Sequence, residues 1–188
     1  TVSAQKLLTG NSYISDIPAV AKRNIYDKTF PLMILYYVGP LKTYAMLPFL
    51  SLNASFIDSV RVFSLSAAVI TILLTYQFSK NNFSKRVAII TTLLLISDPS
   101  FLFSSSFDWG PTSVQNLLKI TALISLFKIM QSPTNKKYLY LLATTSSLLI
   151  WDKLNAIWLL FPLWTILLFK VHRNELKIES KTYIKALF

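Results

Sequence analysis

Four polar residues stand at helical spacing in an otherwise apolar stretch of the sequence. They are Thr112, Gln115, Asn116 and Lys119, at positions i, i+3, i+4 and i+7. This spacing puts the four side chains on one face of a helix that begins shortly after Asp108. A carboxylate and a cation beside one cleft are suited to general base chemistry and to the stabilisation of a departing anion. The meaning of this polar stripe depends on the elements around it.

The composition is that of a membrane protein. Of the 188 residues, 53% are apolar or aromatic and only 14% are charged. The net charge of +11 comes from 19 Lys and Arg that lie mostly between apolar runs, without a nucleic-acid recognition motif, so nucleic acid is not an expected partner. The chain has no cysteine and a single histidine, which argues against disulfides, a thiol nucleophile and a zinc site. Phosphate-loop, zinc-protease and serine-hydrolase motifs are also missing from the sequence.

Five apolar runs approach the length of about 20 residues that a helix needs to cross a bilayer. They cover residues 62–78, 87–103, 111–130, 138–151 and 156–169. Asp98 and Pro99 interrupt the second run, which should therefore kink or restart there. Only four residues separate the last two runs, so these predict a tight helical hairpin in which Asp152 and Lys153 pair at the turn. The predicted fold is all-α, a polytopic transmembrane helix bundle.

Basic residues follow alternate runs. Lys and Arg cluster after the first, third and fifth runs, at 80–86, 136–137 and 170–185, whereas the other connections carry at most one Lys. Cytoplasmic loops are enriched in Lys and Arg, so these clusters predict the cytoplasmic side. Five spans with a cytoplasmic tail satisfy the pattern. They place Asp98, Asp108 and Asp152 on or near the outer face.

Residues 1–60 allow two interpretations. The stretch 30–50 is apolar but contains Pro31, Pro40, Lys42 and Pro48. It is either a sixth span broken by proline or a pair of short helices in the membrane interface, and the charge pattern does not decide between them. The expected organisation is an N-terminal segment at 1–60, a five-span bundle at 61–170 and a cytoplasmic loop or tail at 171–188.

In this frame the polar stripe must face the inside of the bundle. Lys119 lies about 12 Å along its helix from Pro111, and a cation near the bilayer centre costs about 2.5–3.5 kcal/mol. It therefore needs a partner or a wet cavity, and we interpret the stripe as one wall of a polar cleft that opens outward, with Asp108 at its rim. The alternative is that the stripe packs against another helix, while Asp108 only stabilises the helix N-terminus.

Three spaced motifs carry a resemblance to a known family. They are GPLKTY at 39–44, the Asp98-Pro99 pair and FDWGP at 107–111, with Arg61 opening the span between the first two. In this order they resemble the GT-C membrane glycosyltransferases, and in particular proteins akin to the dolichyl-phosphate-mannose protein mannosyltransferases and the lipid A aminoarabinose transferase. The resemblance covers roughly residues 5–169. It implies an outer loop with interfacial helices for residues 1–60.

The resemblance also implies roles for individual residues. Lys42 falls near a basic motif that meets the phosphate of the donor, and Asp108 falls where an acidic residue lines the active-site cavity and orients acceptor or sugar hydroxyls. Lys153 corresponds to a Lys after the end of a span, although Ile150, Trp151 and Asp152 stand where small residues are expected. The candidate phosphate-binding cations are Lys42, Lys119 and Lys153. No residue is assigned to a metal, and whether a divalent cation assists is left open.

The implied reaction is transfer of a sugar, with inversion, from a polyprenyl-phosphate donor to a glycan, lipid or protein acceptor. It would take place in the plasma membrane, with the active site facing outward. Family members carry a further span and an outer acidic pair ahead of the region that corresponds to Thr1. The main base is therefore expected upstream of Thr1, and the chain is expected to be a fragment that is inactive on its own.

Two other function classes fit the same residues. A transporter or channel subunit would use Lys119 and the polar stripe as an intramembrane path. A membrane scaffold without catalysis would use none of the residues named above. The sequence upstream of Thr1 in the parent gene separates the first class from a glycosyltransferase, because only the latter requires the outer acidic pair.

Overall fold

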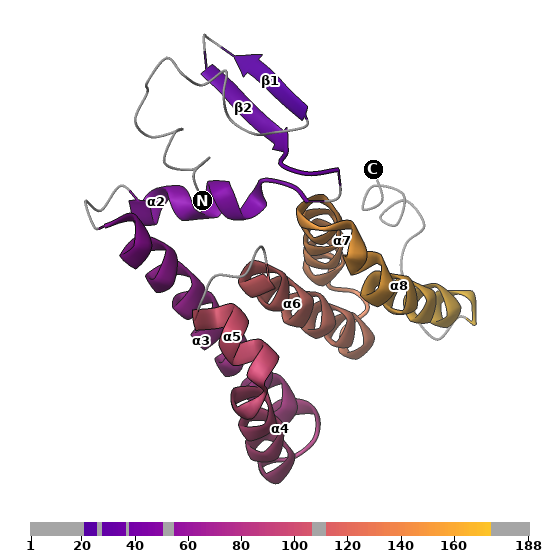
Figure 1. Cartoon of the computed structure of the whole chain (residues 1–188). Coiled ribbons are helices and arrows are strands. Elements are labelled where there is room, and N and C mark those ends of the chain that lie inside the picture. Colours follow the sequence, from indigo (N-terminus) through magenta and orange to yellow (C-terminus); the bar gives the residue numbers. More distant parts are fainter. Residues whose placement is uncertain (1–20, 26–27, 37, 51–54, 107–111, 174–188) are drawn as a thin grey trace. The chain divides into compact units, whose positions relative to one another are not determined.

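The computed structural model describes residues 21–25, 28–36, 38–50, 55–106 and 112–173, and these form two compact units. The first unit comprises Thr1–Leu117 together with Trp151–Lys153, and the second comprises Leu118–Ile150 and Leu154–Phe188. Figure 1 labels the elements. The two units are described separately below.

The first unit opens with a β-hairpin and a short helix. Strands β1 (Ala21–Ile25) and β2 (Lys28–Met33) pair antiparallel, with Arg23 opposite Phe30 and an irregularity between Ala21 and Lys22. Helix α2 (Leu41–Leu50) follows directly after Pro40, whose carbonyl oxygen accepts the first helical hydrogen bond from the Tyr44 N–H (3.1 Å). The described part of the apolar stretch 30–50 is thus divided between a strand and a ten-residue helix, so it contains neither a sixth span nor the expected pair of short helices. The hairpin was not expected from the sequence (Figure 1).

Two polar caps begin the long helices of the first unit. Ser55 precedes α3 (Phe56–Asn82), and its side chain accepts a hydrogen bond from the Asp58 N–H (3.2 Å). Ser84 precedes α4 (Lys85–Ser97), and its hydroxyl oxygen accepts from the Val87 N–H (3.3 Å). These bonds satisfy backbone donors that a helix start leaves without a partner.

The predicted break at Asp98-Pro99 is confirmed. Helix α4 ends at Ser97, α5 (Pro99–Ser106) begins at the proline, and the two helices meet at an angle of 61°. Asp98 caps the second helix, because its Oδ1 accepts a hydrogen bond from the Ser100 N–H (2.9 Å). Helix α3 packs against both α4 and α5. Its small residues Ala67, Ala68 and Thr71 are buried, and such residues let helices approach closely.

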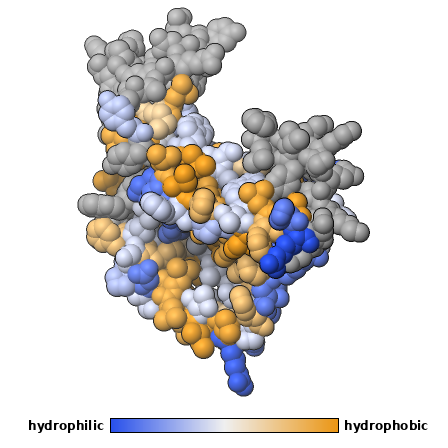
Figure 2. Space-filling view, turned by 90° about the vertical axis from the view of Figure 1, so that its right-hand side faces the viewer, coloured by the Kyte–Doolittle hydropathy of each residue, from blue (hydrophilic) through white to orange (hydrophobic). Residues whose placement is uncertain are grey.

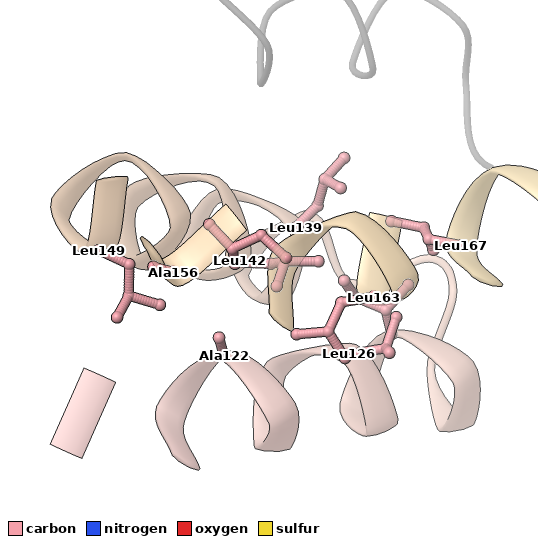
Figure 3. Close-up of a cluster of buried hydrophobic side chains, with 10 residues drawn as sticks. Ala122, Leu126, Leu139, Leu142, Leu149, Ala156, Leu163 and Leu167 are labelled. Carbon is pink, nitrogen blue, oxygen red and sulfur yellow. The ribbon is translucent and has the colours of Figure 1, made fainter. Parts of the chain in front are cut away.

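The second unit is built around leucines from three helices. Helices α6 (Thr112–Gln131), α7 (Lys136–Asp152) and α8 (Ile157–His172) supply it, with the 3₁₀ turn η2 (Leu154–Ala156) between the last two. Figure 3 shows their apolar side chains pointing toward one another. Trp164 of α8 also donates a hydrogen bond from Nε1 to Ser146 Oγ of α7 (3.1 Å). The predicted helical hairpin of α7 and α8 is therefore confirmed.

Within the described residues, three helices are long and apolar enough to cross a membrane. They are Ile57–Asn82, Thr112–Gln131 and Leu154–His172, and a fourth span results if the bent pair α4 and α5 counts as one. Large apolar side chains such as Leu73, Leu94 and Trp158 are exposed, and Figure 2 shows hydrophobic residues over much of the visible surface. Apolar exposure on this scale suits a lipid environment. The predicted class of helical membrane bundle is confirmed, while the count of five spans stays a prediction because α7 has only 17 residues.

Two neighbouring leucines of α7 test the packing of the second unit. Leu142 is fully buried, whereas Leu141 is 37% exposed. We expect Leu142→Ala to lower the free energy of unfolding by about 2–5 kcal/mol, because it leaves a cavity among the core leucines. Leu141→Ala removes the same atoms outside the core and should cost far less. Denaturant titration of the purified protein in detergent measures both, and equal losses would contradict the assignment of the core.

Candidate functional site

A close backbone contact brings the start of α2 to the segment Trp151–Lys153 of the first unit. The Gly39 N–H donates a hydrogen bond to the carbonyl oxygen of Asp152 (2.9 Å), and Val38 pairs with Lys153 as an isolated antiparallel bridge. A Cβ atom on Gly39 would lie 2.0 Å from the carbonyl oxygen of Trp151. Only glycine fits a backbone approach this close.

The Trp151 side chain stabilises the contact between Gly39 and the segment Trp151–Lys153. Its Nε1 donates a hydrogen bond to the carbonyl oxygen of Leu32 (3.1 Å). Its ring also stacks on Tyr44 of α2, with centroids 6.2 Å apart and an interplanar angle of 26°. The indole therefore contacts both the strand that precedes the Gly39 loop and the helix that follows it, which fixes the first turn of α2.

Three buried polar side chains meet at this contact. Lys42 of α2 is 4% exposed, Asp152 is fully buried and Gln115 of α6 is 3% exposed. The Gln115 side chain and the backbone N–H of Lys42 approach the Asp152 carboxylate closely enough to lower its pKa. Within the described residues, however, both carboxylate oxygens and the Gln115 amide nitrogen lack a hydrogen bond of normal geometry. The Asp152 charge is thus stabilised first by Gln115 and the Lys42 backbone N–H and then by the positive charges of Lys42 and Lys153.

Burial moves the pKa values of Lys42 and Asp152 closer to 7. Desolvation raises the pKa of Asp152 to about 6, against the opposing effects of Gln115, Lys42 and Lys153. Desolvation likewise lowers the pKa of Lys42 to about 8, and the Asp152 charge acts in the opposite direction. At neutral pH both groups are therefore mostly charged and their charges interact, and the pKa of each lies about one unit from pH 7.

The structure brings together two of the four residues selected from the sequence. Lys42 and Lys153 both act on Asp152 and belong to the first unit. Asp108 lies outside the described residues, and so does the FDWGP motif around it. Lys119 is half-buried and belongs to the second unit, four residues after Gln115 in α6. The roles assigned to these four residues stay predictions.

Sequence reasoning missed two partners of Asp152, which are Gln115 and Lys42. It paired this carboxylate with the adjacent Lys153, whereas the structure adds Lys42, more than a hundred residues earlier in the chain. Gln115 was recognised as part of the polar stripe, but its approach to Asp152 was not. A glycine beside a proline at 39–40 was the sequence signal for an unusual backbone contact, although it did not reveal the segment contacted.

Helices of membrane-spanning length with exposed apolar side chains define an integral membrane protein, and its first unit contains a buried lysine and a buried carboxylate. Comparison of the sequence with protein-family models identifies the family to which the chain belongs. The sequence model described as dolichyl-phosphate-mannose-protein mannosyltransferase matches residues 38–188, which is most of the chain. The chain therefore belongs to this family, in the GT-C superfamily of membrane glycosyltransferases, and the resemblance seen in the sequence is confirmed. Comparisons with curated proteins and with solved structures gave no match.

The Gly39 contact predicts a position that tolerates no side chain. We expect Gly39→Ala to lower the free energy of unfolding by about 1–3 kcal/mol, because the added methyl group must push the Trp151 carbonyl away. Ser132→Thr, which adds one carbon in an exposed loop residue, is the control. Denaturant titration in detergent compares the two variants. A Gly39→Ala protein as stable as the control would contradict the contact.

Burial of Asp152 predicts a pH dependence of stability. Because the pKa of Asp152 is higher in the folded protein, the folded state binds this proton more tightly than the unfolded chain does. The free energy of unfolding should therefore fall as pH rises from about 4 through about 6, by roughly 1–2 kcal/mol for this group. Asp152→Asn should remove that fall. Unfolding titrations between pH 4.5 and 7 measure it, and identical pH profiles of the two proteins would show that the carboxylate is not buried as described.

Proposed function

We propose that this chain forms the donor-phosphate site of a glycosyltransferase that takes its sugar from a polyprenyl phosphate. The observation that carries the proposal is the buried Lys42 ammonium, held in the first turn of α2 in a member of this family. The acceptor would be a glycan, a lipid or a protein. The reaction would take place at the outer face of the plasma membrane, an orientation that rests on the distribution of Lys and Arg between the apolar runs.

Lys42 has the properties that the leaving group requires. When the bond from the sugar to the phosphate breaks, negative charge grows on the phosphate oxygen, and a cation already fixed in place stabilises that charge without reorganisation. A buried cation does this better than an exposed one because little water screens it. With a pKa of about 8, the Lys42 amine is mostly protonated at neutral pH. Lys153 contributes a second positive charge to the same region.

The remaining groups are assigned by the family resemblance and by the sequence. Asp108 would orient hydroxyl groups of the acceptor or the sugar, and the principal base that deprotonates the acceptor would be another residue. Lys119 would add positive charge on the polar face of α6. Inversion at the anomeric carbon follows if the acceptor oxygen attacks from the side opposite the phosphate.

Substitution of Lys42 tests the proposal. In the complete gene product we expect Lys42→Ala to lower the rate of sugar transfer by about 10²–10³, because a preorganised charge is lost from the transition state. Lys85→Ala removes an exposed lysine at the start of α4 and should leave the rate unchanged. The measurement is transfer of radiolabelled sugar from polyprenyl-phosphate donors in membranes that contain equal amounts of each variant.

The same assay separates the competing function classes. A scaffold predicts that Lys42→Ala and Asp108→Asn both leave sugar transfer unchanged. A transporter or channel predicts solute flux into vesicles but no transfer of label to an acceptor. Either result would overturn the proposed activity.

A further inference from the structure

The Asp152 carboxylate has no part in the proposed reaction. It is nevertheless fully buried, and its charge interacts with that of Lys42. It reaches this place through backbone contacts, since Gly39 bonds to its carbonyl oxygen and Val38 bridges to the next residue. Its side chain lies in the same contact, where the Lys42 backbone N–H and the Gln115 side chain approach the carboxylate. The charged groups that face it in the described part of the chain are Lys42 from α2 and Lys153 from its own segment, and Gln115 faces it from α6.

We propose that Asp152 is a positioning residue, which holds the Lys42 ammonium while the site is empty and takes up a proton when the phosphate of the lipid donor binds to Lys42. This inference rests on the proposed function, because it requires an anionic donor at Lys42. The proton comes from the solvent and adds to a carboxylate oxygen of Asp152. No bond of the donor breaks in this step, and the proton returns to solvent when the site empties.

The empty site needs a carboxylate next to Lys42. A buried ammonium without a counter-charge is costly, and removal of one partner of a buried pair leaves that cost in full. Asp152 supplies the counter-charge, and its backbone is held beside α2 at Gly39, where no side chain fits. The ammonium is thereby kept in one place, ready for an incoming anion.

When the donor is bound, its phosphate and the Asp152 carboxylate cannot both stay ionised. A phosphodiester and a carboxylate would then share one buried cation, and like charges at such a distance disfavour double ionisation. A phosphodiester is a strong acid that stays ionised at neutral pH, so the carboxylate must accept the proton. Asp152 is prepared for this, because burial already raises its pKa to about 6 and neither of its oxygens is committed to a hydrogen bond of normal geometry within the described residues.

Donor binding should therefore depend on pH in a defined way. For the complete wild-type protein and a polyprenyl phosphodiester sugar, we expect binding about tenfold tighter at pH 6 than at pH 7.5, with close to one proton taken up per donor at pH 7. Calorimetry in buffers of different ionisation enthalpy measures the proton uptake. Below pH 7.5 the donor phosphodiester does not titrate and most of the Lys42 amine stays protonated, so the tenfold dependence reports chiefly on Asp152.

Asp152→Asn is the decisive variant. It keeps the shape of the side chain but cannot take up a proton, so its donor affinity should be flat between pH 6 and 7.5 and its proton uptake near zero. Asp98→Asn is the matched control, because it removes the same charge from an exposed helix cap, and it should retain the wild-type profile. A role in folding alone would lower the yield of Asp152→Asn without changing the pH profile of the folded fraction.

Each outcome decides the inference. A pH dependence that persists in Asp152→Asn overturns it, as does donor binding by the wild-type protein without proton uptake. If Asp152→Asn does not fold, the wild-type proton uptake alone still decides. Failure of the proposed function gives a different result, in which Lys42→Ala binds the donor as tightly as the wild-type protein does.

Discussion

The site depends on one backbone approach, the contact of Gly39 with the carbonyl groups of Trp151 and Asp152. It determines where α2 begins relative to Trp151–Lys153 and therefore which charge Lys42 meets. The indole of Trp151 holds both sides of the contact, through its hydrogen bond to Leu32 and its stacking on Tyr44. The charged pair is thus positioned mainly by the main chain and an aromatic ring.

The two kinds of buried group in this protein follow different rules. Leucines of the second unit pack together because each fills space beside others of similar shape, and the cost of losing one is a cavity. Lys42 and Asp152 stabilise the fold little, since desolvation offsets most of their attraction. The presence of such a pair is better explained by a role in binding or catalysis than by a contribution to stability. Perturbed pKa values are also common at functional sites.

Sequence patterns predicted the helices well and the site only in part. The break at Asp98-Pro99, the hairpin of α7 and α8 and the apolar helices depend on local rules of proline geometry, capping and hydrophobic length, which a single sequence contains. The β-hairpin depends on pairing between two short segments that carry no clear alternating pattern. The meeting of Lys42 with Asp152 depends on a contact between segments far apart in the chain, for which an isolated sequence has no signal. Lys42 itself was found through the family motif.

The distance along the chain between Lys42 and Asp152 has a consequence for biosynthesis. A ribosome that adds about 5–20 residues per second needs roughly 5–20 s to extend the chain from the lysine to its partner. During that interval the ammonium has no carboxylate at residue 152 to neutralise it, so water must solvate it while α3 to α6 are synthesised. Assembly of the site is therefore a late event, which follows completion of α7, and nascent chains that stop short of it carry a lysine that water must still solvate.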